Sequence, residues 1–163
     1  MEKLKSDLIA LLQEDSRYSP AKLATMLGTS EGDIRRALSE MERDGIIVKY
    51  SAVINAEKTG VEFVDALIEV RVTPQQSSGF DAIARQIYNF DNVKSVYLMS
   101  GGYDLAVMIE GKTLREVAMF VSERLSTIDG VISTATHFLL KKYKTEGVVL
   151  EPNEPVKRIA VQP

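Results

Sequence analysis

The amino-acid sequence predicts an α+β protein of two domains, and three observations support this prediction. Apolar residues recur at helical spacing through the first part of the chain. A short stretch of polar and turn-forming residues then follows, and beyond it alternating strand-like segments are interleaved with further helical ones. We expect a first domain over 1–54, a linker over 55–61, a second domain over 62–144 and a tail over 145–163.

The composition narrows the functional class. The chain has 163 residues, of which 45% are hydrophobic and 26% charged, as in ordinary globular proteins. It has no cysteine and only one histidine, His137, so disulfides, thiolate or histidine metal clusters and a conventional catalytic triad are not expected. We therefore expect no catalytic residue, no metal and no cofactor. The sequence shows no bilayer-spanning apolar run and no signal peptide, and a cytoplasmic protein with no membrane partner is expected.

The first domain reads as three helices. The first is expected over residues 3–14, where four leucines share one face. The second begins with Ser19 as N-cap and ends at Gly28, and the third begins with Ser30 as N-cap and Asp33 at the capping-box position. Two short helices joined by a tight glycine turn are typical of a helix-turn-helix, which reads DNA with its second helix.

The third helix is the predicted DNA-reading element. Its apolar stripe of Ile34, Leu38 and Met41 leaves Arg35 and Arg36 pointing outward. Arginine pairs with guanine through two hydrogen bonds, so these two are the candidates for base edges. The predicted DNA-binding residues are Ser30, Glu31, Gly32, Arg35, Arg36, Ser39, Arg43 and Lys49, with Arg43 and Lys49 expected on phosphates.

Several features oppose this interpretation. The net charge is −3, and an arginine-bearing helix face is often only solvated. Glu31 and Asp33 would repel phosphates, although they suit a helix N-terminus electrostatically. Gly32 lowers helix propensity, which either allows close approach to the DNA backbone or serves no purpose. Guanidinium groups already held by carboxylates would overturn the interpretation of this helix as the DNA-reading element.

Residues after the third helix are predicted to form a wing. Residues 47–54 are rich in β-branched side chains and read as a strand, which would complete a winged helix-turn-helix.

The second domain reads as β-α-β-β-α-β. The expected strands are 63–72, 93–99, 103–109 and 131–140, with helices over 80–88 and 114–125. Two βαβ halves side by side form a ferredoxin-like sandwich with both helices on one face of an antiparallel sheet. The strands hold too many apolar residues to leave the other face in water, so a dimer is expected. These residues are Tyr97, Met99, Leu105, Val107 and Leu139. Beyond this domain, residues 156–161 either pair as an edge strand or stay mobile.

The whole plan resembles the Lrp/AsnC family of feast/famine transcriptional regulators, whose second domain is a RAM-type ferredoxin-like sandwich. The resemblance covers residues 3 to about 144. It rests on Asp44-Gly45-Ile46-Ile47 followed by Tyr50 and Asn55, on the turn Gly101-Gly102-Tyr103-Asp104, and on Thr134-Ala135-Thr136. The resemblance implies a sequence-specific regulator that binds double-stranded DNA as a homodimer, often within an octamer built as a tetramer of dimers. It also implies an amino-acid effector at the contact between dimers.

The family's effector loop, Gly-(Asp/Glu)-Tyr-Asp, corresponds here to residues 101–104, with Gly102 in place of the acidic residue. The effector-binding residues that the resemblance implies are Gly101, Gly102, Tyr103, Asp104, Thr134 and Thr136. Turn N–H groups can hold a carboxylate, and the Asp104 side chain can hold an ammonium group. The alternative is that the turn needs no ligand and Asp104 only caps the hairpin.

Two other functional classes remain open. Sirohaem decarboxylases share this two-domain plan but depend on several histidines and arginines, whereas this chain has only His137. An architectural DNA-compacting protein would show weak sequence preference and a steep salt dependence, and the acidic net charge counts against it.

Overall fold

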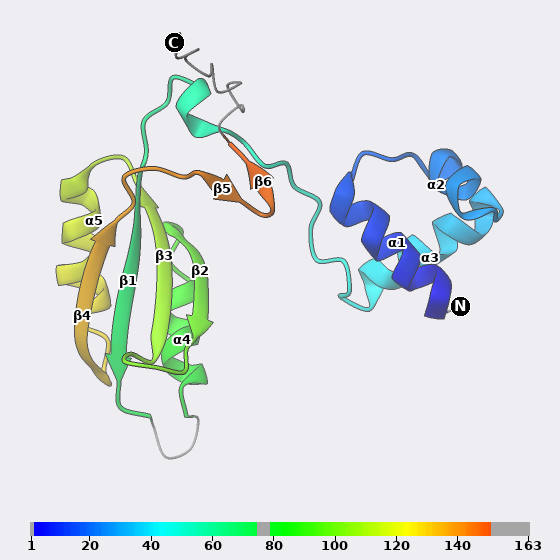
Figure 1. Ribbon diagram of the computed structural model, residues 1–163. Coiled ribbons are helices and arrows are strands. Elements are labelled where there is room, and N and C mark those ends of the chain that lie inside the picture. The colour runs from blue at the N-terminus through cyan, green and yellow to red at the C-terminus, as the bar shows by residue number, and fades with distance from the viewer. Residues whose placement is uncertain (1, 75–78, 151–163) are drawn as a thin grey trace, which may run out of the picture. The chain divides into compact units, whose positions relative to one another are not determined.

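The protein is seen in a computed structural model that describes residues 2–74 and 79–150. The chain divides into two compact units, Met1–Val53 and Ile54–Pro163 (Figure 1).

The first unit contains helices α1 (Glu2–Glu14), α2 (Pro20–Leu27) and α3 (Glu31–Arg43). The predicted caps are confirmed. The Ser19 Oγ accepts a hydrogen bond from the Lys22 N–H, and the Ser30 Oγ accepts one from the Asp33 N–H at 3.1 Å. Gly28 ends α2 in the left-handed region at φ 62°, a conformation that glycine adopts without steric cost. The local sequence signals thus place the turn between α2 and α3.

The three helices enclose a small apolar core. Leu8 of α1, Leu23 of α2, and Ile34 and Met41 of α3 are completely buried. Ala37 is also buried, and Leu38 packs against this core at its margin. Burial of each large side chain stabilises the unit by about 1.5–3 kcal/mol, which short isolated helices require. The predicted apolar stripe of α3 is therefore confirmed and holds the opposite face of the helix outward.

The predicted wing strand is wrong. Residues 47–54 contain no strand, and among the described residues 44–63 the only regular element is the short 3₁₀ helix η1 (Ala56–Lys58). Ile46 and Ile47 donate their N–H groups to the Met41 carbonyl, which closes α3. The chain then runs outward with Val48 88% exposed. β-branched composition predicts an extended backbone, but a strand also needs a partner to accept its hydrogen bonds.

The second unit has the predicted β-α-β-β-α-β order. Its elements are β1 (Val64–Val72), α4 (Asp81–Tyr88), β2 (Val93–Leu98), β3 (Leu105–Gly111), α5 (Leu114–Phe120), which continues as the π-helical turn η2 (Val121–Leu125), and β4 (Val131–Phe138). The four strands pair antiparallel in the order β2-β3-β1-β4. Figure 1 shows α4 and α5 on the same side of this sheet, as the ferredoxin-like prediction requires.

The core of this unit lies between the sheet and the two helices. Strand side chains such as Ile68 and Val107 pack against Ile83 of α4 and Phe120 of α5. Leu105 and Val107 were counted among the apolar residues that a dimer partner would cover. Both are instead fully buried in this core. Tyr97 and Met99 remain 56% and 40% exposed, and Leu139 is half-buried.

A small hairpin that the sequence did not predict follows the sheet. Strands β5 (Lys144–Thr145) and β6 (Val148–Val149) pair antiparallel within the segment expected to begin a tail. Its turn uses Glu146 at φ 47° and Gly147 at φ 79°. Residues 156–161, for which a strand or a mobile tail was expected, lie outside the described residues.

Candidate nucleic-acid interface and effector site

The outer face of α3 carries most of the predicted DNA-binding residues. The side chains of Arg35 and Arg36 are 64% and 69% exposed, opposite the buried stripe. Ser39 and Arg43 lie further along the same helix and are also exposed. The buried positions of α3 therefore bring these side chains together on one accessible surface, whereas Lys49 lies beyond the helix in the exposed segment that follows it.

The arginines of this face are not free of carboxylates. The Glu31 Oε1 accepts hydrogen bonds from Arg35 Nε at 2.9 Å and from Arg35 Nη2. The Arg36 Nη1 donates to Asp33 Oδ1 at 3.2 Å. The observation named above as opposing DNA reading, guanidinium groups held by carboxylates, is therefore present in the structure. A glutamate four residues before an arginine is a readable signal for such a pair, and sequence reasoning did not use it.

These ion pairs are too weak to block DNA binding. An exposed pair four residues apart on a helix contributes about 0.3–0.5 kcal/mol, because water screens both charges. A two-pronged contact between arginine and guanine discriminates by about 1–3 kcal/mol. Arg35 can therefore turn to DNA at small cost, and the arginine face remains able to read bases.

Asp33 serves the helix cap as well as Arg36. Its Oδ2 accepts a hydrogen bond from the Ser30 hydroxyl at 2.7 Å, while its backbone N–H donates to the Ser30 Oγ. The hydroxyl of Ser30, assisted by the charge of Arg36, holds the pKa of Asp33 below its ordinary value. Asp33 is thus ionised at neutral pH and fixed to the first turn of α3.

The charge of the first unit is low for a DNA-binding domain. Residues 1–53 hold eight lysines and arginines and nine aspartates and glutamates, a net charge of −1. Within residues 2–53, the cations without an ion pair are Lys3, Lys22 and Lys49. Arg43 pairs with Asp44 at 3.0 Å. The unit therefore offers phosphates little net positive charge.

The predicted effector turn joins β2 to β3 and is tied to β1. The Asp104 N–H donates to the Val70 carbonyl at 3.0 Å, and its Oδ2 accepts the Val72 N–H at 2.8 Å. The pairing of β1 with β4 shifts register between Arg71 and Val72. The Asp104 carboxylate therefore secures the hairpin to the irregular end of β1, as the capping alternative supposed.

Arg71 of β1 contacts this turn, and sequence reasoning missed it. Its Nε donates to the Gly102 carbonyl at 2.9 Å, and its side chain is exposed. The guanidinium places a positive charge beside the turn at which Gly102 replaces the acidic residue of the family loop. Sequence position alone does not show that Arg71 reaches the turn, because the contact depends on how the strands pair.

The two predicted threonines lie on β4 and face the helices. Thr134 pairs with Val70, and Thr136 pairs with Ile68, both buried under α4 and α5. The Thr134 hydroxyl is 3.3 Å from the Ser126 hydroxyl. Because Val70 also pairs with Leu105, Thr134 lies at the same end of the sheet as the turn, about two strand spacings or 10 Å away. Thr136 lies one step further from the turn.

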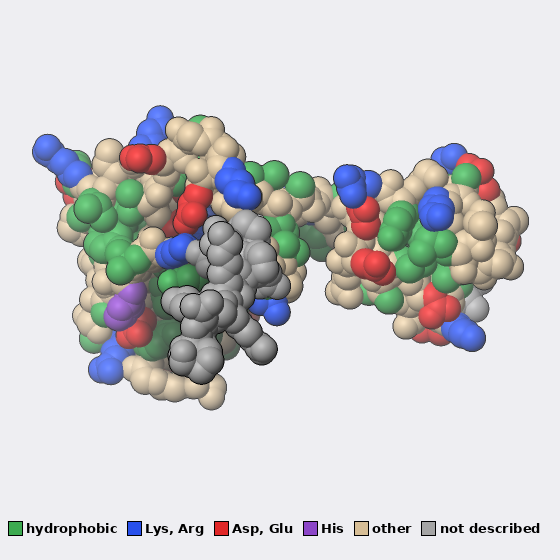
Figure 2. Space-filling view, turned by 45° about the horizontal axis from the view of Figure 1, so that its top comes forward, with side chains coloured by type: hydrophobic (Ala, Val, Ile, Leu, Met, Phe, Trp, Pro, Cys, Tyr) green, Lys and Arg blue, Asp and Glu red, His purple; other side chains and the backbone are tan. Residues whose placement is uncertain are grey.

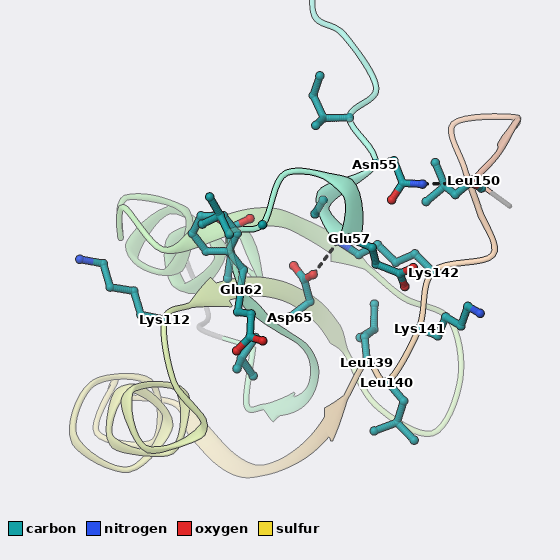
Figure 3. A pocket seen from close by; sticks show the side chains of 17 residues that line it. Asn55, Glu57, Glu62, Asp65, Lys112, Leu139, Leu140, Lys141, Lys142 and Leu150 are labelled. Atoms are coloured by element: carbon teal, nitrogen blue, oxygen red, sulfur yellow. Dashed lines mark hydrogen bonds and ion pairs between the residues drawn. The ribbon is translucent and has the colours of Figure 1, made fainter.

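A separate pocket of about 540 Å³ lies at the other end of β1 (Figure 3). Its walls come from residues 54–65, from the end of β3 and from residues 139–142 and 150. An ion pair between Lys142 Nζ and Asp65 Oδ2 at 2.6 Å lies within it, and the Asn55 side chain donates to the Leu150 carbonyl. None of the predicted effector residues lines this pocket.

The sheet face opposite the helices mixes apolar and polar side chains. Pairing places Tyr97, Ala106, Glu69 and Ala135 in one row across it. His137 contacts Glu69 here at 3.3 Å, and Figure 2 shows the histidine beside acidic, basic and hydrophobic side chains. The described residues contain no group of acidic or histidine side chains that could hold a metal ion. None of their helices has the length and apolarity to cross a membrane.

Family models match both units. The model of a winged helix-turn-helix DNA-binding domain matches residues 1–48, and that of the Lrp/AsnC ligand binding domain matches residues 65–149. The sequence is 45% identical to the uncharacterized HTH-type transcriptional regulator YugG of Bacillus subtilis, over 98% of this chain and 96% of that one. These matches indicate a transcription regulator and not an enzyme.

Solved structures of the same fold confirm the architecture. The AsnC structure from E. coli aligns with a TM-score of 0.68 at 19% identity, covering 89% of this chain and 95% of that one. A transcriptional regulator from Neisseria meningitidis, NMB0573, solved as a complex with L-Met, aligns with a TM-score of 0.71 at 22% identity, covering 89% and 93%. With a DNA-binding helix-turn-helix followed by a ligand-binding βαββαβ domain, the chain belongs to the Lrp/AsnC family of transcriptional regulators.

Proposed function

We propose that this regulator binds a specific DNA sequence as a dimer or larger homo-oligomer and that a small amino-acid-like effector modulates the binding. One observation carries the DNA-reading part. The buried residues Ile34, Ala37 and Met41 fix α3 so that Arg35 and Arg36 project together from its exposed face. Arginines presented in this way can contact guanine in the major groove.

The sheet face opposite the helices supports a dimer. Tyr97 and Met99 leave apolar area exposed on the strands or at their ends, and a second copy would cover it. A two-fold dimer would present two α3 helices to successive major grooves, about 34 Å apart, and so read a palindrome. Further assembly of dimers, up to the octamer that the resemblance implies, would bridge several DNA sites.

The turn at residues 101–104 supports the effector part. Its backbone lies beside the Arg71 guanidinium, which can attract the carboxylate of an amino acid. The related structure from Neisseria meningitidis is a complex with an amino acid, L-Met. Binding here would alter how dimers associate and hence which DNA sites can be occupied together.

Selection of bound sequences from a randomised DNA pool by the full chain tests the DNA-reading part. We expect a palindromic consensus with half-sites about one helical turn apart. The consensus site is then titrated with each of the twenty amino acids, and the particle size is followed by light scattering. Recovery of no consensus would refute sequence-specific reading. A consensus whose occupancy responds to no amino acid would refute the effector proposal alone.

A further inference from the structure

The side chains of Glu31 and Arg35 form an ion pair on the exposed face of α3. One carboxylate oxygen, Glu31 Oε1, accepts hydrogen bonds from both Nε and Nη2 of Arg35. The side chain of Glu31 is 45% exposed and that of Arg35 is 64% exposed. The pair thus stands at the solvent surface of the first two turns of α3, where the recognition helix of a helix-turn-helix meets base edges.

The geometry of the guanidinium group decides which donors remain. Arginine has five N–H donors in a fixed planar fork, one on Nε and two on each Nη. Glu31 accepts from the edge formed by Nε and Nη2, and this leaves both donors of Nη1 and one of Nη2. These donors include the end-on pair that can reach O6 and N7 of guanine together. Glu31 therefore occupies the edge of Arg35 that base reading does not need.

We propose that Glu31 is a positioning residue that holds Arg35 extended and end-on for one guanine of the DNA site. The inference rests on the proposed sequence-specific binding. In the free protein, Glu31 restricts the rotamers of a long side chain, so less conformational entropy is lost when Arg35 binds the base. Another base does not offer the two adjacent acceptors that guanine presents to the Arg35 end-on donors, and the carboxylate nearby opposes a compensating contact with phosphate.

Arg36 is held differently. Only its Nη1 donates to Asp33, at 3.2 Å, and Asp33 is already committed to the Ser30 hydroxyl. Arg36 therefore has fewer constraints on its orientation than Arg35. Its contact with DNA does not depend on a carboxylate in the same way.

Measurement of base discrimination tests the positioning role. The full-length variant Arg35→Ala first locates the guanine that Arg35 reads. This guanine is the consensus position at which the variant no longer prefers one base. Glu31→Gln is then compared with the native chain on sites that carry each of the four bases at this position. We expect the preference for guanine there to fall about twofold, the fold-change that corresponds to an exposed ion pair at this spacing. Affinity for unrelated DNA should rise because a negative charge is lost.

Asp7→Asn is the matched control, because it removes the same charge from α1 of the same unit and leaves every residue of α3 unchanged. It should leave the preference at the Arg35 position unchanged. Unaltered guanine preference in Glu31→Gln would overturn the inference and leave Glu31 a role only at the helix N-terminus. A lost cytosine preference at another position would also overturn it, since Glu31 would then read a base itself. If the native chain selects no consensus, the proposed function fails before this comparison is reached.

Discussion

Replacement of Gly32 by alanine separates the stability of α3 from its use on DNA. Gly32 is the second residue of α3, and its φ lies outside the left-handed region. A Cβ built there has the Ser30 Oγ as its nearest neighbour at 3.7 Å, an ordinary van der Waals distance. Alanine therefore fits without strain and removes the entropy cost of glycine in a helix. We expect Gly32→Ala to raise the free energy of unfolding by about 0.5–1 kcal/mol.

The assay pairs urea unfolding, followed by circular dichroism, with DNA titration. Gly28→Ala is the matched control, because a Cβ at Gly28 would meet nothing within 4 Å but the φ there is 62°, so alanine should destabilise the protein by about 1–2 kcal/mol. If Gly32 allows the DNA backbone to approach α3 closely, Gly32→Ala will weaken specific binding in spite of its greater stability. Unchanged DNA affinity in Gly32→Ala would refute a close approach of the DNA backbone to α3. A lower free energy of unfolding in this variant would refute the argument that alanine fits the helix without strain.

Three further outcomes are expected. The double variant Arg35→Ala, Arg36→Ala should abolish specific binding in a mobility-shift assay while light scattering shows the same oligomer as before. Asp104→Ala should lower the free energy of unfolding by about 1–3 kcal/mol, because it removes a charged acceptor from a partly buried backbone N–H, and Asp104→Asn should lose less. The side chain of Arg17 lowers the pKa of Asp15 to about 2, so the stability that this pair contributes is present above the ordinary value of 3.8. That contribution is lost as the pH falls through about 2, and Asp15→Asn should flatten the acid-unfolding curve between these values.

Local signals predicted the helices and the sheet because each rests on neighbouring residues. Ser19, Gly28 and Ser30 bound the helices through contacts within a few residues. The alternation of apolar and polar residues predicted the strand over 63–72, because strand side chains point to opposite sides in turn. The wing at residues 47–54 was predicted wrongly, since the same composition suits any exposed extended chain. The β5–β6 hairpin was missed because strands of two residues carry no periodic pattern.

The site was predicted less completely than the fold. The outward direction of Arg35 and Arg36 followed from the helix period and is confirmed. Glu31 stands four residues before Arg35, so the sequence already indicated this ion pair. The negative charge of Glu31 was instead considered only for its repulsion of phosphates. The bond from Arg71 to Gly102 joins residues 31 apart in sequence and requires the three-dimensional pairing of β1 and β3. The DNA-contacting and effector-binding roles themselves stay predictions.

The low charge of the first unit bears on how specificity arises. Non-specific affinity comes mainly from cations that neutralise phosphates, and this unit has a net charge of −1 with most of its cations paired. A single copy of such a unit gains little from an arbitrary DNA sequence. Base contacts made by a few arginines then form a larger share of the binding energy than in a basic protein. In the proposed oligomer, weak attraction from each copy would make binding depend on two or more linked copies acting at once, since linkage raises the effective concentration of the second unit. Oligomer assembly is therefore the step at which an effector could control DNA occupancy without touching the DNA-reading helix.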